Sequence, residues 1–149
     1  MTQAEFEAWL PRQEAEYARL IEGSGALPAQ AARVKARQDT ARRFIGGLAS
    51  PGQFVFRVVA GDAPVGWLWL GVPGPDLDPL MAWVYDIEID AAFRGRGYGR
   101  GAMALAEAEA RARGMRSLGL NVHGQNTVAR SLYESLGYEV TALQMKKLV

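Results

Sequence analysis

The chain has 149 residues, of which 49% are hydrophobic and 22% are charged, and its formal net charge is +1. This size suits one globular domain spanning residues 1–149, and the small charge gives no general attraction to nucleic acid or to a membrane surface. The lack of cysteine excludes disulfides, thiolate metal ligands and a cysteine acyl-enzyme, and with His123 as the one histidine we predict no metal site. Without an apolar run of about 18 residues or a basic and apolar leader, the sequence predicts a cytoplasmic protein.

Two helices are predicted in the first third of the chain. Thr2 and Glu5 have the spacing of a capping box, so a helix begins near Thr2. Its apolar residues follow helical spacing: Phe6, Trp9, Leu10, Tyr17, Leu20 and Ile21. Pro11 falls inside this pattern and predicts either a kink or a helix that begins near it. Pro28 suits the first turn of a second helix, whose buried side is predicted to be Val34, Gln38, Ala41, Ile45 and Leu48.

After Pro51-Gly52 the periodicity changes from that of helices to that of strands. Residues 54–60 and 65–70 are predicted to be two strands joined by the turn 61–64. The remaining predicted elements are a strand at 83–90, a helix at 97–113, a strand at 117–122, a helix at 126–136 and a final strand at 138–148. This order predicts an α/β fold of the α+β kind with a mixed sheet.

The run Phe93-Arg-Gly-Arg-Gly-Tyr-Gly-Arg-Gly101 joins a predicted strand to a predicted helix. Glycines let the backbone turn sharply and approach a ligand closely, and the N–H groups at the start of a helix form an anion site. Arg94, Arg96 and Arg100 add positive charge, so the run predicts a phosphate or pyrophosphate site. A glycine turn that serves only packing is the alternative, but it does not account for the three arginines.

Other phosphate-binding motifs fit this run less well. Gly97, Gly99 and Ala102 match a relaxed dinucleotide fingerprint, but no carboxylate ends the strand 117–122 to hold a ribose hydroxyl. The Gly-Lys-Ser/Thr of an ATP-binding P-loop is missing, and an RNA-binding Arg-Gly segment would be longer and flanked by disorder. A nucleotide-binding fold of another class stays as an alternative.

A second motif lies downstream: Asn126-Thr-Val-Ala-Arg-Ser-Leu-Tyr133-Glu-Ser-Leu-Gly-Tyr138. Together with Arg94-Gly-Arg-Gly-Tyr-Gly99 it resembles the GNAT superfamily of N-acetyltransferases, which has an Arg/Gln-x-x-Gly-x-Gly/Ala motif and an Asn-x-x-Ala-x-x-Leu-Tyr-x-x-x-Gly-Phe/Tyr helix. The resemblance extends from about Phe54 to the C-terminus. It implies a GNAT-like domain with a central, splayed, mixed sheet flanked by helices. The leading strand of that family is absent or short here, because the helical pattern begins almost at Met1.

The resemblance implies acetyl-CoA as co-substrate. Its pyrophosphate would bind the backbone N–H groups of residues 95–99 beside Arg94, and its pantetheine arm would pair like a strand with residues 87–89. Asn126 would hydrogen-bond the arm, although it is equally suited to a plain helix N-cap. The implied cofactor-binding residues are Ile87, Ile89, Arg94, Gly95, Arg96, Gly97, Tyr98, Gly99, Arg100 and Asn126.

The resemblance also implies that Tyr133 is the general acid that protonates the departing CoA thiolate. Pattern alone favours a different role for this tyrosine. Ala129, Leu132, Tyr133 and Leu136 have the spacing of a helix face that packs on a core.

Carboxylates on the strand 83–90 are candidates for the catalytic base that takes a proton from the amine. Strand alternation places one set of residues on each face, with Asp86, Glu88 and Asp90 opposite Tyr85, Ile87 and Ile89. Glu88 is the first choice because it lies beside the proposed pantetheine strand, and Asp86 is the second. A solvated strand face and His123 as base are the alternatives.

The predicted function is therefore acetyl-CoA-dependent N-acetyl transfer, made directly to a primary amine. Between Arg57 and Arg94 there is no Lys or Arg, whereas acidic residues and tryptophans recur, which favours a cationic small molecule or a lysine-type acceptor. Those tryptophans are equally suited to core packing. The alternative function is a non-catalytic acetyl-CoA-binding or sensor module. A sheet edge left open by the missing leading strand favours a homodimer.

Overall fold

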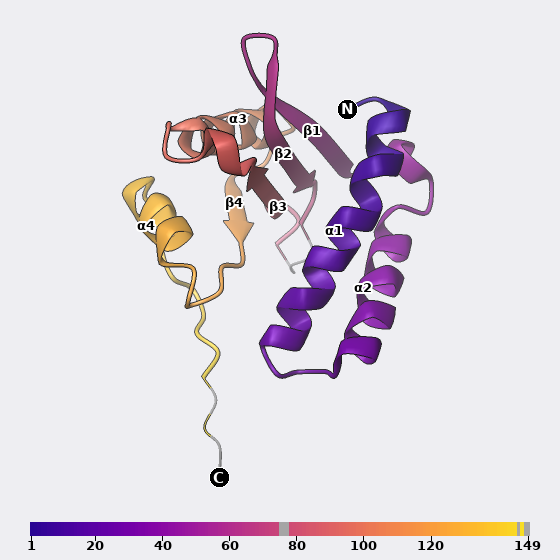
Figure 1. Cartoon of the computed structure of the whole chain (residues 1–149). Coiled ribbons are helices and arrows are strands. Elements are labelled where there is room, and N and C mark those ends of the chain that lie inside the picture. Colours follow the sequence, from indigo (N-terminus) through magenta and orange to yellow (C-terminus); the bar gives the residue numbers. More distant parts are fainter. Residues whose placement is uncertain (75–77, 146, 148–149) are drawn as a thin grey trace.

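The computed structural model describes residues 1–74, 78–145 and 147. Its elements are α1 (Gln3–Gly23), α2 (Ala29–Arg43), β1 (Gln53–Ala60), β2 (Ala63–Gly71), β3 (Met81–Ile89), α3 (Tyr98–Ala112), β4 (Ser117–Leu120) and α4 (Thr127–Ser135) (Figure 1). The predicted α/β class with a mixed sheet is confirmed. Among the described residues no strand precedes α1, as the helical pattern at the N-terminus indicates.

The sheet has the strand order β1-β2-β3-β4. β1 and β3 are both antiparallel to β2, and β4 is parallel to β3. Figure 1 shows α1 and α2 on one side of the sheet and α3 and α4 on the other. Each face has its own core. Phe6 and Trp9 of α1 pack on Trp69, whereas Met103 of α3 and Tyr133 of α4 pack on the opposite face.

Helix α1 begins at the predicted capping box, in which Thr2 and Glu5 bond each other's backbone N–H groups. It continues through Pro11 to Gly23, so the prediction of a helix that starts near Pro11 is wrong. Proline removes the hydrogen bond to the carbonyl four residues earlier. Here both Pro11 and Glu7 are exposed, and water can bond to that carbonyl instead.

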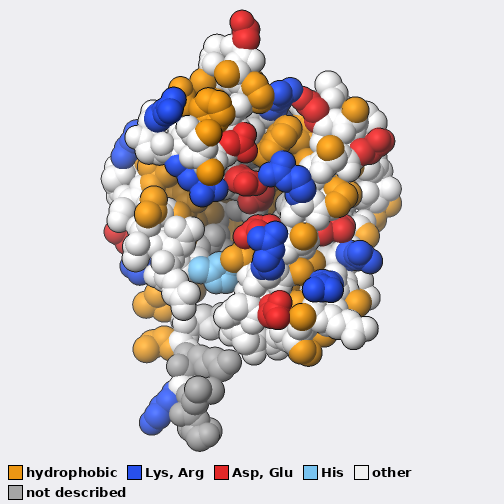
Figure 2. Space-filling model, viewed as in Figure 1, with side chains coloured by type: hydrophobic (Ala, Val, Ile, Leu, Met, Phe, Trp, Pro, Cys, Tyr) orange, Lys and Arg blue, Asp and Glu red, His pale blue; other side chains and the backbone are white. Residues whose placement is uncertain are grey.

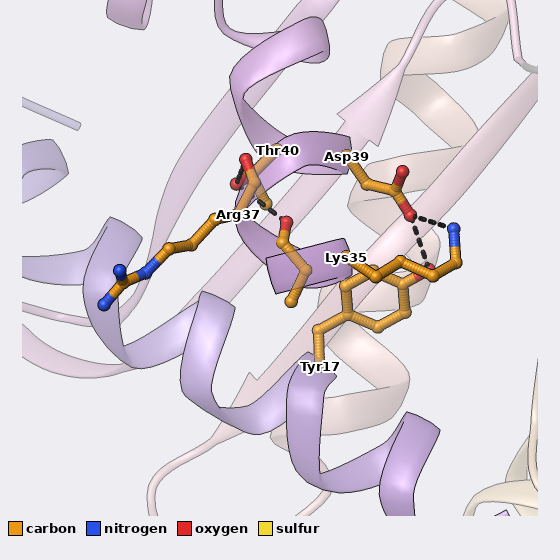
Figure 3. A network of polar contacts seen from close by, with 6 residues as sticks. Tyr17, Lys35, Arg37, Asp39 and Thr40 are labelled. Atoms are coloured by element: carbon orange, nitrogen blue, oxygen red, sulfur yellow. Dashed lines mark hydrogen bonds and ion pairs between the residues drawn. The ribbon is translucent and has the colours of Figure 1, made fainter. Parts of the chain in front are cut away.

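The predicted buried side of α2 is also wrong. Val34 is exposed, and Ile45, which lies beyond the end of α2, is 87% exposed; the helix instead buries Ala32, Ala36 and Thr40. These small side chains let α2 lie close against α1. Polar contacts then join the two helices. Thr40 Oγ1 donates to Glu14 Oε1 at 2.6 Å, and Asp39 accepts from the hydroxyl of Tyr17 at 3.2 Å (Figure 3). Within α2, Asp39 also accepts from Lys35 at 2.7 Å.

The final strand predicted at 138–148 is not formed over residues 138–145, and residues 146 and 148 lie outside the described residues. After Tyr138 the chain instead runs away from the body of the molecule (Figure 1). A strand needs a neighbour to bond its N–H and C=O groups, and none of the described residues supplies one here.

Candidate active site

Strands β3 and β4 separate halfway along β3. Their pairing runs from Met81↔Ser117 to Val84↔Leu120, whereas β3 stays paired with β2 as far as Ile89. Residues 85–89 therefore have no strand partner on the β4 side among the described residues. This is the splayed sheet expected from the resemblance. It leaves the backbone N–H and C=O of Ile87 and the N–H of Ile89 without a strand partner on this side, so they can pair with an extended ligand.

A register shift at the point of separation changes which face each side chain occupies. Trp69 pairs with Asp86, but the next residue, Leu70, pairs with Val84, so Tyr85 is an extra residue in β3. Tyr85 consequently packs against Trp69, with ring centroids 4.7 Å apart, and lies under Arg43. The prediction that Tyr85 shares a face with Ile87 and Ile89 is therefore wrong, because those two residues pack on the opposite core.

Asp86 occupies the first position beyond this irregularity and is largely buried. Burial raises the pKa of its carboxyl to about 6 from an ordinary 3.8, and the negative charges of Glu88 and Glu16 act in the same direction. Glu16 comes from α1, far away in the sequence, and no local pattern pointed to it. A carboxyl group with this pKa is ionised at neutral pH and still retains appreciable basicity.

Glu88 has a more open environment than Asp86. Its side chain is partly exposed, and its Oε1 lies 3.8 Å from Nη2 of Arg12 on α1. At this separation and exposure the ion pair contributes little to stability. Both carboxylates of β3 thus face helix α1, which lies about 70 residues earlier in the chain.

Tyr133 projects from α4 into the core that α3 and β3 share, and it is 9% exposed. Burial, followed by the charge of Asp86, raises the pKa of its hydroxyl above the ordinary value. The hydroxyl group forms no hydrogen bond with the residues that the structure describes. Ala129, Leu132 and Leu136 pack on the same core, so the core-packing interpretation of this helix face and the presence of Tyr133 at the site are compatible.

The glycine run forms a tight loop and the start of α3. Gly95 and Gly97 have φ angles of +73° and +84°, which other residues rarely adopt, and Gly97 is the N-cap of α3. No side chain caps this helix, so the N–H groups of its first turn are free for an anion. Gly99 lies close to α4, because a Cβ there would be 3.3 Å from Cδ2 of Leu132.

The three arginines of the run lie in different surroundings. Arg94 donates from Nε to the carbonyl of Ile89 at 2.8 Å, which holds the loop against the end of β3. Arg100 donates to Oγ of Ser135 at 2.5 Å and so links α3 to α4. The guanidinium of Arg96 lies over the ring of Phe93 at 5.9 Å. All three arginines are exposed at this face.

Asn126 is the N-cap of α4, and its Oδ1 accepts a hydrogen bond from the N–H of Ala129 at 3.1 Å. The plain N-cap role is therefore present in the structure. Capping uses one oxygen, and the Nδ2 group of Asn126 forms no hydrogen bond with any described residue. His123, the other side chain considered for catalysis, is exposed in the loop before this helix.

The tryptophans of the acidic region serve packing. Trp69 is buried among aromatic rings, and Trp83 covers Gly119, where a Cβ would lie 2.6 Å from its ring. Figure 2 shows acidic side chains gathered in the middle of one face, with Lys and Arg side chains around them. Within residues 1–74, 78–145 and 147, no group of three or more His, Cys, Asp and Glu residues could hold a metal ion. None of the helices in these ranges is long and apolar enough to cross a membrane.

A mixed sheet whose central strands separate beside a glycine-rich helix start is the architecture of an acetyltransferase. Residues 13–138 match the Acetyltransferase (GNAT) family, and the chain belongs to this family. The uncharacterized N-acetyltransferases YycN and YdgE of Bacillus subtilis (strain 168) are each 30% identical to it. YycN aligns over 148 residues and YdgE over 152, which in both cases covers 99% of this chain and 94% of the relative.

Two solved structures share this fold. The crystal structure of YycN has a TM-score of 0.89 at 29% identity and covers 100% of this chain and 95% of its own. Aminoglycoside N-acetyltransferase AAC(6')-Iy in complex with CoA has a TM-score of 0.57 at 17% identity, over 77% of this chain and 87% of its own, and shares the fold. The expectation of a GNAT acetyltransferase is confirmed.

Proposed function

We propose that this protein transfers the acetyl group of acetyl-CoA directly to a primary amine on a cationic acceptor. One observation carries the proposal: where β3 and β4 separate, the charge of Asp86 acts on the buried hydroxyl of Tyr133. A hydroxyl donor and a carboxylate acceptor in the same part of the site are the two groups that amine acylation requires.

Three features support acetyl-CoA as the donor. The uncapped start of α3 at Gly97 offers N–H groups for a pyrophosphate, with Arg94 and Arg96 beside it. The unpaired edge at Ile87 and Ile89 offers hydrogen bonds for the amide groups of the pantetheine arm. The same fold binds CoA in AAC(6')-Iy. The free Nδ2 of Asn126 is suited to bond the same arm.

In the proposed reaction the amine nitrogen attacks the thioester carbonyl, and a backbone N–H near Ile89 stabilises the oxyanion. A carboxylate on β3 takes a proton from the nitrogen. The carbon–sulfur bond then breaks, and Tyr133 gives its proton to the thiolate. Asp86 is better supported as the base than Glu88, because it is largely buried and its charge acts on Tyr133, whereas Glu88 is partly exposed and near Arg12.

The preference for a cationic acceptor rests on the carboxylates and not on the tryptophans. The charges of Glu88 and Glu16 both raise the pKa of Asp86, so these three carboxyl groups form one negative region on the α1 side of the site. A protonated amine is attracted to such a region and then loses its proton to the base. Cation–π contact with Trp69 is not available, because that ring is buried.

The direct test measures thiol release from acetyl-CoA with a panel of amines, together with acetyl-CoA affinity by calorimetry. Tyr133→Phe should lower turnover by about 100-fold while the affinity changes little, because it removes the proton-donating hydroxyl group and little volume. Asp86→Asn should lower turnover more than Glu88→Gln does. The reverse order would assign the base role to Glu88. Binding of acetyl-CoA with no thiol release for any amine would favour the sensor module instead.

A further inference from the structure

A small cavity lies between the helix pair and the sheet, next to the strand that carries Asp86. It has a volume of about 60 Å³, and the side chains that line it include Gln13, Tyr17, Asp39, Arg43 and Tyr85. A single water needs about 10 to 15 Å³, so this space holds a small polar group such as one amino-acid head group. Tyr17 and Asp39 already bond each other across the two helices (Figure 3), whereas two other members of the lining do not have such partners.

Gln13 supplies an acceptor that no described residue uses. Its Oε1 atom is buried, and none of the described residues donates a hydrogen bond to it. Buried polar atoms nearly always have a partner, and an unpaired one is costly. Because Gln13 lines the cavity, an N–H group of a molecule bound there would supply the missing bond.

Arg43 supplies a cation that forms no ion pair with the described carboxylates. Its guanidinium lies over the ring of Tyr85, 4.3 Å from the centroid, and this stacking leaves the edge of the group free to donate. Asp39, the carboxylate of the same cavity, already accepts from Lys35 at 2.7 Å and from the hydroxyl of Tyr17 at 3.2 Å. A guanidinium with a free edge suits a carboxylate, which it can bind through two parallel hydrogen bonds.

The cavity is close to the proposed catalytic base. Gln13 lies three residues before Glu16 on α1, and the charge of Glu16 acts on Asp86. Tyr85 of the cavity directly precedes Asp86 on β3. Helix positions three apart lie about 5 to 6 Å from each other, so the cavity and the carboxyl of Asp86 are separated by roughly that distance. A chain of three or four methylene groups spans about the same length.

We propose that the cavity binds the head group of a free diamino acid, such as lysine or ornithine, whose side-chain amine is the acceptor. Arg43 binds the α-carboxylate and Gln13 Oε1 accepts from the α-ammonium group, while the side-chain ammonium reaches the negative region around Asp86. This role rests on the proposed function and narrows its acceptor to one substrate class.

Transfer forms a bond between the side-chain nitrogen and the acetyl carbon and breaks the carbon–sulfur bond of the thioester. Two protons leave the side-chain ammonium group. One passes through Asp86 to water, and the other replaces the proton that Tyr133 gives to the thiolate. The α-ammonium group stays bound at Gln13 and is not acetylated.

The first experiment measures thiol release at saturating acetyl-CoA for two matched pairs of acceptors, lysine with cadaverine and ornithine with putrescine. The members of each pair differ only in the carboxylate. The amino acid should have a kcat/KM at least about 10-fold higher, because its carboxylate gains charge-assisted hydrogen bonds. Mass spectrometry should locate the acetyl group on the side-chain nitrogen.

The outcomes separate this proposal from the proposed function. Equal kcat/KM within each pair, or acetylation of the α-nitrogen, would overturn the diamino-acid assignment and leave N-acetyl transfer intact. No thiol release with any amine would overturn both.

Arg43→Met removes the charge and keeps an apolar stem on Tyr85. It should raise the KM for lysine by about 30-fold, whereas kcat/KM for cadaverine should stay within about twofold, because cadaverine has no carboxylate. Arg42→Met is the matched control and should change neither value, since Arg42 is exposed and does not line the cavity. An equal loss with both acceptors would show that Arg43 supports only the fold, and its role as a ligand would be overturned.

Gln13→Leu tests the unpaired oxygen. It should raise the urea concentration at the midpoint of unfolding, because it removes a buried acceptor without a partner, and also raise the KM for lysine by about 5-fold. A less stable variant with an unchanged KM would mean that the oxygen serves the fold alone, and its part in the head-group site would be wrong.

Discussion

Asp86 must be ionised to act as a base, yet its surroundings disfavour the charge. Burial and the charges of Glu88 and Glu16 raise its pKa to about 6, so the folded protein holds the proton more tightly than the unfolded chain does. The contribution of this group to stability is therefore fully present below about pH 4. It is lost as the pH rises to about 6 and beyond. A group that opposes folding at working pH is best explained by a chemical role.

Asp86→Asn should accordingly stabilise the protein while it removes activity. At about pH 8 the free energy of unfolding should rise by at most about 3 kcal/mol, and at about pH 4 it should change little, because the amide resembles the protonated acid. Urea unfolding at the two pH values measures this difference. For the wild type, kcat/KM should increase with pH up to about 6 and then level off. If Asp86→Asn lowered the stability equally at both pH values, the surroundings of Asp86 would not disfavour its ionised form.

At the scale of elements, local chemistry predicts much of this fold. Alternating residues in β1 to β3, the glycine run before α3 and the capping box of α1 each specify their own conformation, and all three appear in the structure. The errors lie where a distant contact decides. Ala32 and Ala36 are buried instead of Val34 because α1 packs closely on that side. No periodicity in β3 indicates that Tyr85 is an extra residue, since its register depends on Trp69 and Leu70 of β2.

In the site, too, the residues of continuous motifs could be predicted, whereas those that depend on distant contacts could not. The two motifs, residues 94–99 and 126–138, could be recognised in the sequence because each is continuous along the chain. Arg12 and Glu16 could not, since nothing in α1 distinguishes them from other solvated charges of that helix. Their effect on Glu88 and Asp86 arises only when α1 packs on the sheet. The sequence prediction ranked Glu88 above Asp86 from their positions along one strand. It could not include the greater burial of Asp86, which only the folded structure shows.

The start of α3 gives a prediction for an element as a whole. Gly97→Ala should destabilise the protein by about 1 to 2 kcal/mol, because Gly97 has a φ of +84°, and should also weaken acetyl-CoA binding by displacing the first-turn N–H groups. Gly101→Ala is the matched control, since a Cβ there meets nothing within 4 Å and alanine favours helix by up to about 1 kcal/mol. Urea unfolding and calorimetry check both variants. Similar effects of the two substitutions would contradict a special role for the Gly97 conformation.

At the scale of the whole molecule, two cores hold the two faces of one sheet, and the proposed ligand lies on only one of them. Acetyl-CoA would contact β3, α3 and α4, which share the core around Met103 and Tyr133. The helix pair α1 and α2 is held separately, through the cluster around Trp9 and Phe44 and through its own polar contacts. Binding should therefore stabilise the α3–α4 side directly and the remainder through the shared sheet.

Acetyl-CoA at 100 times its Kd should raise the free energy of unfolding by about 2.7 kcal/mol, because it binds the folded chain and not the unfolded one. Thermal unfolding with increasing acetyl-CoA measures this effect without any acceptor, so it separates cofactor binding from catalysis. NAD and ATP at equal concentrations should produce little change. Arg94→Ala, which removes the guanidinium beside the helix start, should require more acetyl-CoA for the same shift. Equal stabilisation by all three ligands would mean that the glycine run recognises phosphate alone, and the acetyl-CoA assignment would then lose its main support.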